Sequence, residues 1–247
     1  MQLNSLNGSN VKEFFTTPYF NAYNAFLALH ADGSLMKKFK PTNILIGIIF
    51  TLFFISIGVI AAVNFRFIYY FDIKYLDIPN TSGYDVETIT KNYDALIDYN
   101  SPFFKGDLEF PSLPSSNEGL QHFVEVKNIF VSFYGIFGIT LLLLIIIVVY
   151  KAKKKDTSYL LVSSITVLVL PIIVLLGCMV NFDAAFVLFH KIFFRNDFWL
   201  FDPSLDPIIN ILPDTFFLHS LIVIVLFVLL GSLTLFLSSN ISKRRKY

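Results

Sequence analysis

Four long apolar segments alternate with polar stretches along the chain. Residues 44–63, 129–150, 158–180 and 220–239 contain no Asp, Glu, Lys or Arg. Each is long enough to cross about 30 Å of hydrocarbon at about 1.5 Å per residue. Because a membrane offers no water to backbone polar groups, these segments are predicted to be helices. The pattern therefore predicts an α-helical membrane protein with a four-span bundle, in which Pro171 can kink the third span.

The charged residues between the spans indicate an orientation. Lysine and arginine concentrate in residues 1–43, in the turn 151–157 and in the tail 240–247. Residues 65–128 instead carry ten acidic and five basic side chains, and residues 181–217 carry five and two. Because basic segments stay in the cytoplasm, we predict two cytoplasmic termini and two larger extracytoplasmic connectors. The net charge of +1, divided in this way, gives no reason to expect nucleic acid as a partner.

The resulting plan has a cytoplasmic segment, four spans, an extracytoplasmic cap, a cytoplasmic turn, an extracytoplasmic interfacial flap and a cytoplasmic tail. In chain order these are residues 1–43, 44–63 (span), 64–128 (cap), 129–150 (span), 151–157 (turn), 158–180 (span), 181–219 (flap), 220–239 (span) and 240–247 (tail). Met36 is followed by lysines and then by the first span, as at a natural start. Residues 1–35 are therefore predicted to be an upstream extension.

The cap is predicted to be a small mixed α/β unit. Aromatic and β-branched residues in 65–78 favour a strand, and residues 107–113 favour a second, short one. Residues 85–99 favour a helix, with one apolar face made of Val86, Ile89, Tyr93, Leu96 and Ile97. Ser115 and Glu118 match a capping box, which predicts the start of a helix that runs on into the second span.

The flap, "NFDAAFVLFHKIFFRNDFWLFDPSLDPIINILPDTFF", combines apolar bulk with ionisable side chains. Its first part places four phenylalanines on one helical face, which predicts a helix lying in the interface plane: Phe182, Phe186, Phe189 and Phe193. Trp199 suits the aromatic belt of a membrane protein. Asp206 and Pro207 suit the N-cap and first residue of a short helix. His219, at the start of the fourth span, is predicted to be an interfacial anchor.

Two histidines on separate extracytoplasmic segments lie at a similar predicted depth. His122 comes seven residues before the second span, and His190 lies in the flap helix. Histidine is the usual general base near neutral pH. Glu125, three residues after His122, could orient its ring. Anchoring of each ring at the interface is the competing interpretation of the pair.

Other chemistries have weaker support. Two histidines with carboxylates could bind zinc, but no HExxH motif or clustered ligand spacing occurs, so no metal is predicted. No GxSxG motif indicates a serine hydrolase, and no glycine-rich loop indicates a phosphate-binding cofactor. No ionisable acidic or basic residue lies inside a span, which argues against an ion-coupled transporter.

The runs "GLQHFVEVKNIF" and "FHKIFFRNDFWLFDPSLDPIINILPDTFF", set among four spans, resemble the bacterial lipoprotein intramolecular transacylase family of low-GC Gram-positive bacteria. The resemblance covers residues 36–247. It implies an enzyme that moves the sn-2 acyl chain of a diacylglyceryl-modified lipoprotein onto the amine of the lipoprotein's own N-terminal cysteine. It also implies lipoproteins and membrane lipids as partners, no cofactor, and His122 and His190 as the catalytic residues.

Further residues are candidates for binding substrate, for orienting the histidines or for stabilising the oxyanion: Glu125, Arg195, Asp197, Trp199 and Asp202. We predict that His190 takes a proton from the attacking amine and that His122 returns one to the leaving glycerol oxygen. A non-catalytic scaffold that binds a partner through the cap is the main alternative. A phospholipid hydrolase or a metal-dependent enzyme using the same histidines is a second alternative.

Overall fold

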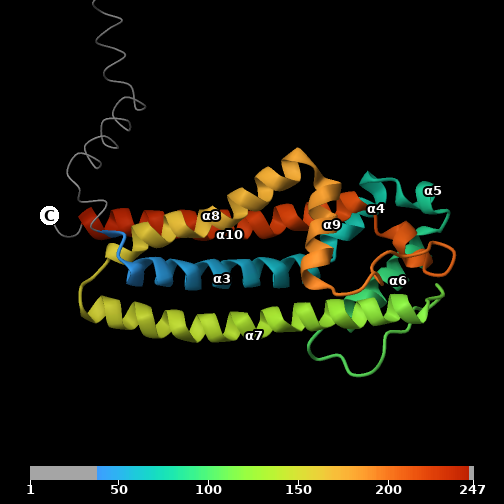
Figure 1. Cartoon of the computed structure of the whole chain (residues 1–247), viewed down its shortest axis with the longest axis horizontal. Coiled ribbons are helices and arrows are strands. Elements are labelled where there is room, and N and C mark those ends of the chain that lie inside the picture. Colours follow the sequence, from blue (N-terminus) through green and yellow to red (C-terminus); the bar gives the residue numbers. More distant parts are fainter. Residues whose placement is uncertain (1–37, 245–247) are drawn as a thin grey trace, which may run out of the picture.

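All regular structure in the described part of the chain is helical. The computed structural model describes residues 38–244 (Figure 1). Its elements are α3 (Pro41–Asn64), α4 (Phe67–Tyr75), α5 (Ile78–Ser82), α6 (Val86–Tyr99), α7 (Asn117–Lys153), α8 (Ser158–Val180), α9 (Phe182–Phe193), the 3₁₀ helix η2 (Pro207–Ile211) and α10 (Asp214–Arg244). The predicted extension, residues 1–35, lies outside the described residues.

Four helices are long and apolar enough to cross a membrane: α3, α7, α8 and α10. α3 packs against the other three, and α10 also packs against α8. Accordingly, 44% of the most apolar window of α3 is buried inside the protein, against 11% for α7. α3 is therefore the centre of the bundle, and α7 leaves most of its apolar surface facing outward. α8 continues as a helix through Pro171.

Glycines bring the long helices close together. A methyl group at Gly47 of α3 would lie 2.7 Å from the Cβ of Thr166 in α8. A methyl group at Gly231 of α10 would lie 2.5 Å from the ring of Phe54 in α3. Close packing at such small residues drives helix association in lipid, because the hydrophobic effect does not favour contact between helices there. A hydrogen bond from the Ser232 hydroxyl to the Ser164 carbonyl, at 2.8 Å, adds a polar link between α10 and α8.

The predicted α/β character of the cap is wrong, since no strand occurs among residues 38–244. Most of residues 65–78 form α4, and residues 107–113 form an irregular loop. Tyr69, Asp72 and Ile73 are buried at helical spacing, whereas Phe67 and Phe71 are exposed. The aromatic content of this segment therefore serves the two faces of a helix. Burial of one face decides the structure here, over the preference of these residue types for strands.

The helix predicted for residues 85–99 is α6, whose N-cap Asp85 accepts a hydrogen bond from the Thr88 amide at 2.7 Å. Ile89, Tyr93 and Leu96 are buried as predicted, but Val86 is 54% exposed. The ring of Tyr93 stacks on that of Tyr69 in α4, with centroids 3.7 Å apart. This aromatic pair is the middle of a core that also takes residues from η2 and from the start of α10.

α7 runs without a break from the cap through the second predicted span. Its N-cap is Ser116, one residue after the predicted Ser115, and the Ser116 hydroxyl accepts a hydrogen bond from the Gly119 amide. The carboxylate of Asp206 accepts hydrogen bonds from both the Ser116 amide and the Ser116 hydroxyl. Asp206 precedes η2 as predicted but makes no side-chain capping bond there. It links the flap to the start of α7 instead.

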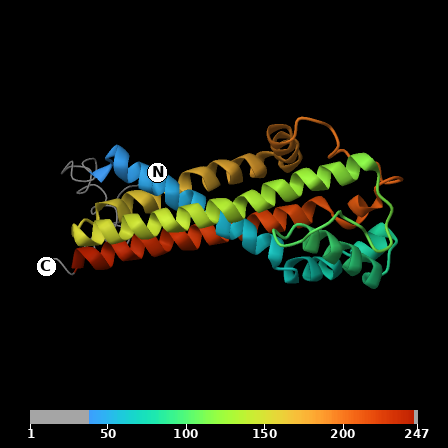
Figure 2. The ribbon, with the colours of Figure 1, turned by 90° about the horizontal axis from the view of Figure 1, so that it is seen from below.

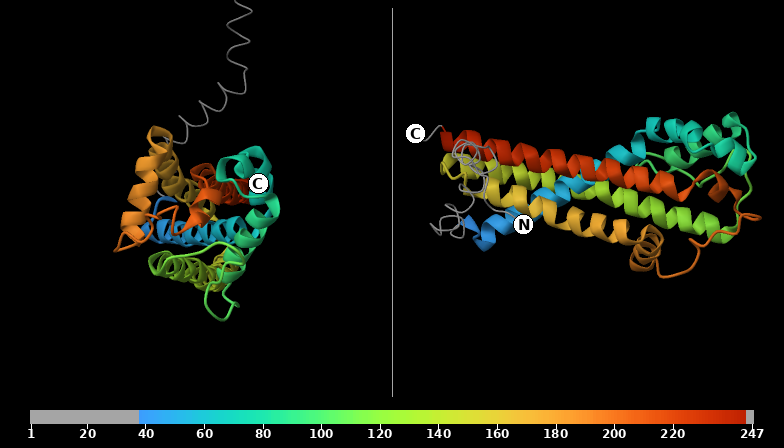
Figure 3. Two further views of the ribbon diagram at one scale, coloured as in Figure 1. Left: turned by 90° about the vertical axis from the view of Figure 1, so that its right-hand side faces the viewer. Right: turned by 90° about the horizontal axis from the view of Figure 1, so that it is seen from above.

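The cap and the flap helix lie at one end of the bundle. α4, α5, α6 and η2 are grouped beyond the spans, and α9 runs across the bundle axis at the end of α8 (Figures 1 and 2). The start of α3, the turn between α7 and α8 and the end of α10 lie together at the opposite end (Figure 3). Because α7 extends beyond the bundle toward the cap, its first turns lie beside the flap.

Candidate active site

The two predicted histidines meet between α7 and α9. The ring centroids of His122 and His190 lie 6.0 Å apart, with 34° between the ring planes. The residues are 4% and 8% exposed. His122 lies in the first turns of α7, before the apolar segment 129–150, and His190 lies on the buried side of α9. Two residues 68 positions apart in sequence thus form one buried pair.

Aromatic side chains surround this pair. The His122 ring lies edge-on to Phe194 and to Phe201, with centroid distances of 4.7 and 5.5 Å. The indole of Trp199 stacks on the His190 ring at 4.6 Å. Phe186, one turn before His190, lies at 4.2 Å from it. Three of these four aromatic side chains follow α9, and Phe186 lies within it. The loop after α9 and α9 itself therefore enclose the two histidines together.

A backbone hydrogen bond fixes the tautomer of His190. Its Nδ1 lies 2.8 Å from the carbonyl oxygen of Phe186. A carbonyl only accepts hydrogen bonds, so Nδ1 of the neutral ring carries the hydrogen and Nε2 carries the free lone pair. The same bond would stabilise the ring after Nε2 had taken up a proton. His190 thus has the geometry of a base with Nε2 as its basic atom.

Burial keeps both rings neutral near pH 7. Burial, together with the neighbouring His190 ring, lowers the pKa of His122 to about 4. Burial also lowers the pKa of His190, and the hydrogen bond to the Phe186 carbonyl opposes that shift. His190 is therefore the ring better able to accept a proton, and His122 is the ring held more strongly in its neutral form.

Several buried polar atoms around the pair have no hydrogen-bond partner among the described residues. They are Nδ1 of His122, Oε2 of Glu125 and Nε1 of Trp199. The other carboxylate oxygen of Glu125 accepts a hydrogen bond from the Asn196 side chain at 2.8 Å. Glu125 therefore links α7 to the flap. The spacing in sequence suggested that Glu125 would orient the His122 ring, but no hydrogen bond joins these two side chains. Unpaired buried polar atoms are costly, and they mark places where a substrate can supply the missing partner.

Three predicted candidates lie on the surface. Arg195 and Asp197 are exposed, and neither side chain makes a hydrogen bond or ion pair with another described residue. The Asp202 carboxylate accepts hydrogen bonds from the amide and hydroxyl of Ser204, which lower the pKa of Asp202. Asp202 thus shapes a turn of the flap. Of the five supporting candidates, Trp199 contacts a histidine ring and Glu125 binds the flap loop beside them.

The sequence analysis did not single out three residues of the site, and it missed a second pair of residues that interact. Phe194, Phe201 and Asn196 were not singled out, because only the path of the loop brings them to the histidines. His219, predicted to be an interfacial anchor, has Nδ1 2.8 and 2.9 Å from the two carboxylate oxygens of Asp72. Asp72 is fully buried and belongs to the segment predicted as a strand. A helical reading of 67–75 would have placed it on the buried face.

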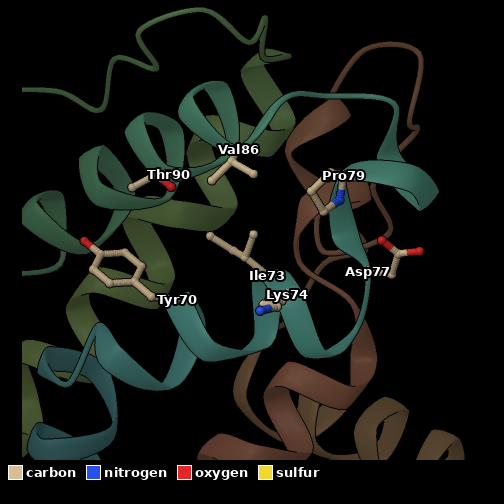
Figure 4. A pocket seen from close by; sticks show the side chains of 7 residues that line it. All are labelled: Tyr70, Ile73, Lys74, Asp77, Pro79, Val86 and Thr90. Carbon is tan, nitrogen blue, oxygen red and sulfur yellow. The ribbon is translucent and has the colours of Figure 1, made fainter.

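A cavity of about 530 Å³ lies between α4, α5 and α6, and no histidine lines it (Figure 4). Its walls are formed by Tyr70, Ile73, Lys74, Asp77, Pro79, Val86 and Thr90.

Within residues 38–244, no group of three or more His, Cys, Asp or Glu side chains is arranged to hold a metal ion.

Comparison with known proteins gives one family and one set of structures. The family described as lipoprotein intramolecular transacylase Lit matches residues 44–217. A structure of the membrane integral lipoprotein intramolecular transacylase Lit from Bacillus cereus is 38% identical, with a TM-score of 0.78, over 83% of this chain and 97% of its own. Curated proteins give no match.

Two other structures of the Bacillus cereus protein carry substitutions of one histidine. The arginine variant is 35% identical, with a TM-score of 0.75, over 92% of this chain and 98% of its own. The alanine variant has the same identity and TM-score, over 90% of this chain and 98% of its own. The similarity thus extends over nearly the whole described chain.

Proposed function

The chain belongs to the lipoprotein intramolecular transacylase Lit family, and from this premise we propose a mechanism in which His122 and His190 catalyse the acyl transfer. The protein is a multi-pass membrane enzyme of the acyltransferase class. In the proposed reaction, the N-terminal cysteine of a diacylglyceryl lipoprotein receives the sn-2 acyl chain from its own glycerol. The product is the lyso form, with an N-acyl group and an S-monoacylglyceryl group.

The reaction joins two groups of one molecule. The amine nitrogen attacks the sn-2 ester carbonyl, the carbon–oxygen bond to glycerol breaks, and an amide bond forms. The amine loses one proton and the glycerol oxygen gains one. Because donor and acceptor share one substrate, the high effective concentration of a tethered pair supplies much of the acceleration. An α-amino group has a pKa of about 7.7–8.0, so a base of moderate strength is sufficient.

His190 is the proposed base. Its Nδ1 hydrogen is committed to the Phe186 carbonyl, which leaves Nε2 free to accept the amine proton. The carbonyl would then stabilise the resulting imidazolium, in the way that an orienting acceptor supports a catalytic histidine. No comparable acceptor holds His122 among the described residues. This asymmetry supports the assignment of the base to His190.

His122 is the proposed proton donor to the leaving oxygen. With a pKa lowered to about 4, it is a poor base at neutral pH, but the N–H of its neutral ring can donate a hydrogen bond to developing negative charge. The protonated His190 ring lies beside it, with centroids 6.0 Å apart, and can replace the proton that His122 gives up. The pair therefore returns to its starting state after each turnover.

Trp199 is the proposed oxyanion donor. Its indole Nε1 is buried without a partner, and the indole stacks on His190. A donor held in place before the reaction and shielded from water stabilises a tetrahedral oxyanion strongly. Arg195 is less suited to this role, because its side chain is exposed.

The aromatic side chains around the two histidines exclude water from the site. Water would otherwise convert acyl transfer into hydrolysis.

The proposed site faces the outer leaflet. The turn 151–157 and the end of α10 lie at the end of the bundle away from α9 (Figure 1), and their lysines and arginines support a cytoplasmic location for that end. Exposed apolar side chains on α9, such as Leu188, Ile192 and Phe193, suit a helix seated in the interface, where the substrate's acyl chains enter the membrane.

The observation that carries this proposal is the approach of two buried histidines from separate helices. The test expresses the chain in a strain that makes only diacylglyceryl lipoproteins and identifies the modified N-terminal peptide by mass spectrometry. The natural chain should give the lyso form, and His122→Ala or His190→Ala should leave the diacylglyceryl form. Val124→Ala, an outward-facing truncation on the same turn of α7, is the matched control and should keep activity.

The same experiment separates the rival assignments. A chain that only scaffolds a partner through its cap would tolerate both histidine substitutions. A phospholipid hydrolase would release free fatty acid from ordinary phospholipid and leave the lipoprotein amine unmodified. Lyso-form production by either alanine variant, at the level of the natural chain, would exclude the proposed histidine mechanism.

A further inference from the structure

A second cavity, lined mainly by polar and charged side chains, lies at the end of the bundle opposite the histidines. It has a volume of about 420 Å³, within the range of about 300–1,000 Å³ typical of ligand pockets. It is lined by residues before α3, in the turn between α7 and α8, and near the end of α10: Lys38, Lys154, Lys155, Asp156, Thr157, Ser158, Leu161, Ser239 and Lys243. We call it the lysine cavity. It plays no part in the proposed acyl transfer.

Four of the lining side chains are lysines, drawn from three segments of the chain. Burial lowers the pKa of Lys38, and the positive charge of Lys243 lowers it further, so these two ammonium groups repel each other. The one acidic lining residue, Asp156, accepts a hydrogen bond from Lys151 at 2.6 Å and another from the Ser158 amide. Its charge is therefore already matched by a lysine outside the lining. The lining of the cavity therefore carries four lysines and one aspartate, which is an excess of positive charge.

Hydroxyl groups in the cavity are also available to a ligand. Ser239 is 3% exposed, and its hydroxyl makes no hydrogen bond with a described residue. Thr157 is the N-cap of α8 but makes no side-chain capping bond. The Ser239 side chain lines the cavity, so its hydroxyl could donate a hydrogen bond to a phosphate oxygen held there. Lysines and hydroxyl donors around one cavity are the groups that bind phosphate.

The position of the cavity selects the source of that phosphate. Leu161 of α8 forms an apolar part of the wall, and the apolar spans begin directly beside it. A ligand held here would have its charge among the lysines and its remaining mass beside the membrane. Basic pockets between membrane helices on the cytoplasmic side bind anionic lipid headgroups. We propose that the lysine cavity binds the phosphate of an anionic phospholipid from the leaflet at this end of the bundle.

The test measures lipid binding to the purified full-length chain in detergent by native mass spectrometry, with phosphatidylglycerol and phosphatidylcholine added in parallel. The natural chain should prefer phosphatidylglycerol. Lys38→Gln/Lys243→Gln should weaken phosphatidylglycerol binding by about 10-fold or more, because each lysine near an anionic lipid contributes about a 5-fold factor. Lys38→Arg/Lys243→Arg should retain binding, since the charge is kept.

A matched variant separates the cavity from the general basic surface. Lys40 and Lys153 are exposed lysines at the same end of the bundle, outside the lining of the cavity. Lys40→Gln/Lys153→Gln removes the same charge and should leave the preference for phosphatidylglycerol intact. Helical circular dichroism of each variant checks that it has folded.

Three results would overturn the proposal. They are equal binding of the two lipids by the natural chain, an unchanged preference in Lys38→Gln/Lys243→Gln, and an equal loss in the Lys40 and Lys153 control. Inorganic phosphate, added alone at millimolar concentration, should not displace phosphatidylglycerol. Displacement would reassign the cavity to free phosphate and so overturn its assignment to a lipid.

Discussion

At the scale of single residues, burial gives the two imidazoles different tasks. Both rings are almost fully enclosed, and burial lowers the pKa of each. The difference between them is one hydrogen bond, from Nδ1 of His190 to the Phe186 carbonyl. The sequence was sufficient to single out the two histidines, because each lies on a segment outside the predicted spans. The tautomer was not predictable from sequence, because it depends on a carbonyl whose position the helix sets.

The lowered pKa values predict how the rate depends on pH. A base must be neutral, so a histidine with a lowered pKa stays active at a lower pH than an ordinary one, with its pKa of about 6.5. Below about pH 8, protonation of the substrate amine should reduce the rate of lyso-form production about 10-fold per pH unit. The steeper fall caused by protonation of His190 should begin below pH 6.5, because burial lowers the pKa of this ring. The measurement is the rate with purified enzyme from about pH 5 to about pH 9.

A fall of about 100-fold per pH unit that already begins at about pH 6.5 would contradict this account, because it would mean that an ordinary histidine titrates together with the amine. The Lys105→Gln variant is a control for changes in surface charge, because Lys105 is exposed in the cap loop.

Substitution of Trp199 tests the proposed oxyanion donor. Trp199→Phe keeps an aromatic ring against His190 but removes the indole N–H. Since one preorganised donor contributes a factor of about 10²–10³, we expect a loss of that order in the rate of acyl transfer. The thermal unfolding temperature should change little, because Nε1 has no partner to lose. A rate close to that of the natural chain would assign Trp199 a packing role only.

At the scale of elements, hydrophobic length was a better guide than residue type. The four apolar segments are helical, as their length predicted, because a membrane leaves the backbone no alternative. The cap segment 65–78 looked like a strand because of its aromatic and β-branched residues. It forms α4 because Tyr69, Asp72 and Ile73 meet the core at helical spacing. Residue preferences alone did not reveal this periodicity.

Gly119 tests the link between the flap and α7. A methyl group there would lie 2.2 Å from Oδ1 of Asp206, whose carboxylate is held by two hydrogen bonds from Ser116. Gly119→Ala should therefore destabilise the protein by about 1–3 kcal/mol and reduce activity, because η2 and the start of α7 must separate. Gly135→Ala is the control on the same helix, since open space surrounds that position.

Thermal unfolding of the two variants in detergent makes the comparison. Gly135→Ala should leave the unfolding temperature unchanged or raise it, because alanine favours a helix by about 1 kcal/mol over glycine. Equal unfolding temperatures in both variants would mean that the Asp206 carboxylate moves away at no cost, and that the link does not hold the flap.

At the scale of the whole molecule, the cap is held to the bundle by a polar pair with a buried carboxylate as well as by its aromatic core. Asp72 of α4 and His219 of α10 join the two parts. This pair was missed because Asp72 was assigned to a strand and His219 to the lipid interface. The four-span architecture followed from sequence, whereas the approach of His190 to His122 and the contacts of the cap required the positions of the helices to be known.

Removal of the Asp72 charge should weaken the attachment of the cap. Asp72→Asn keeps the shape of the side chain, but a hydrogen bond to a buried charged group is worth about 1.5–3 kcal/mol, and we expect a loss of that order in the free energy of unfolding. Asp94→Asn is the control, because Asp94 pairs with Arg66 at a partly exposed site, where ion pairs contribute about 0–1 kcal/mol. Equal effects of the two substitutions would contradict a special role for the Asp72–His219 pair.

The most direct test of the histidine mechanism is a double-mutant cycle on the purified enzyme. It compares single-turnover rates of lyso-form production for the natural chain, His122→Gln, His190→Gln and the double variant, each shown to be folded by circular dichroism. We predict that each single variant is slower by about 10²–10⁴, and that the double variant is no slower than the slower single, because the two rings act as one unit. A single variant that keeps the natural rate, or a double variant in which the two losses multiply, would contradict this account.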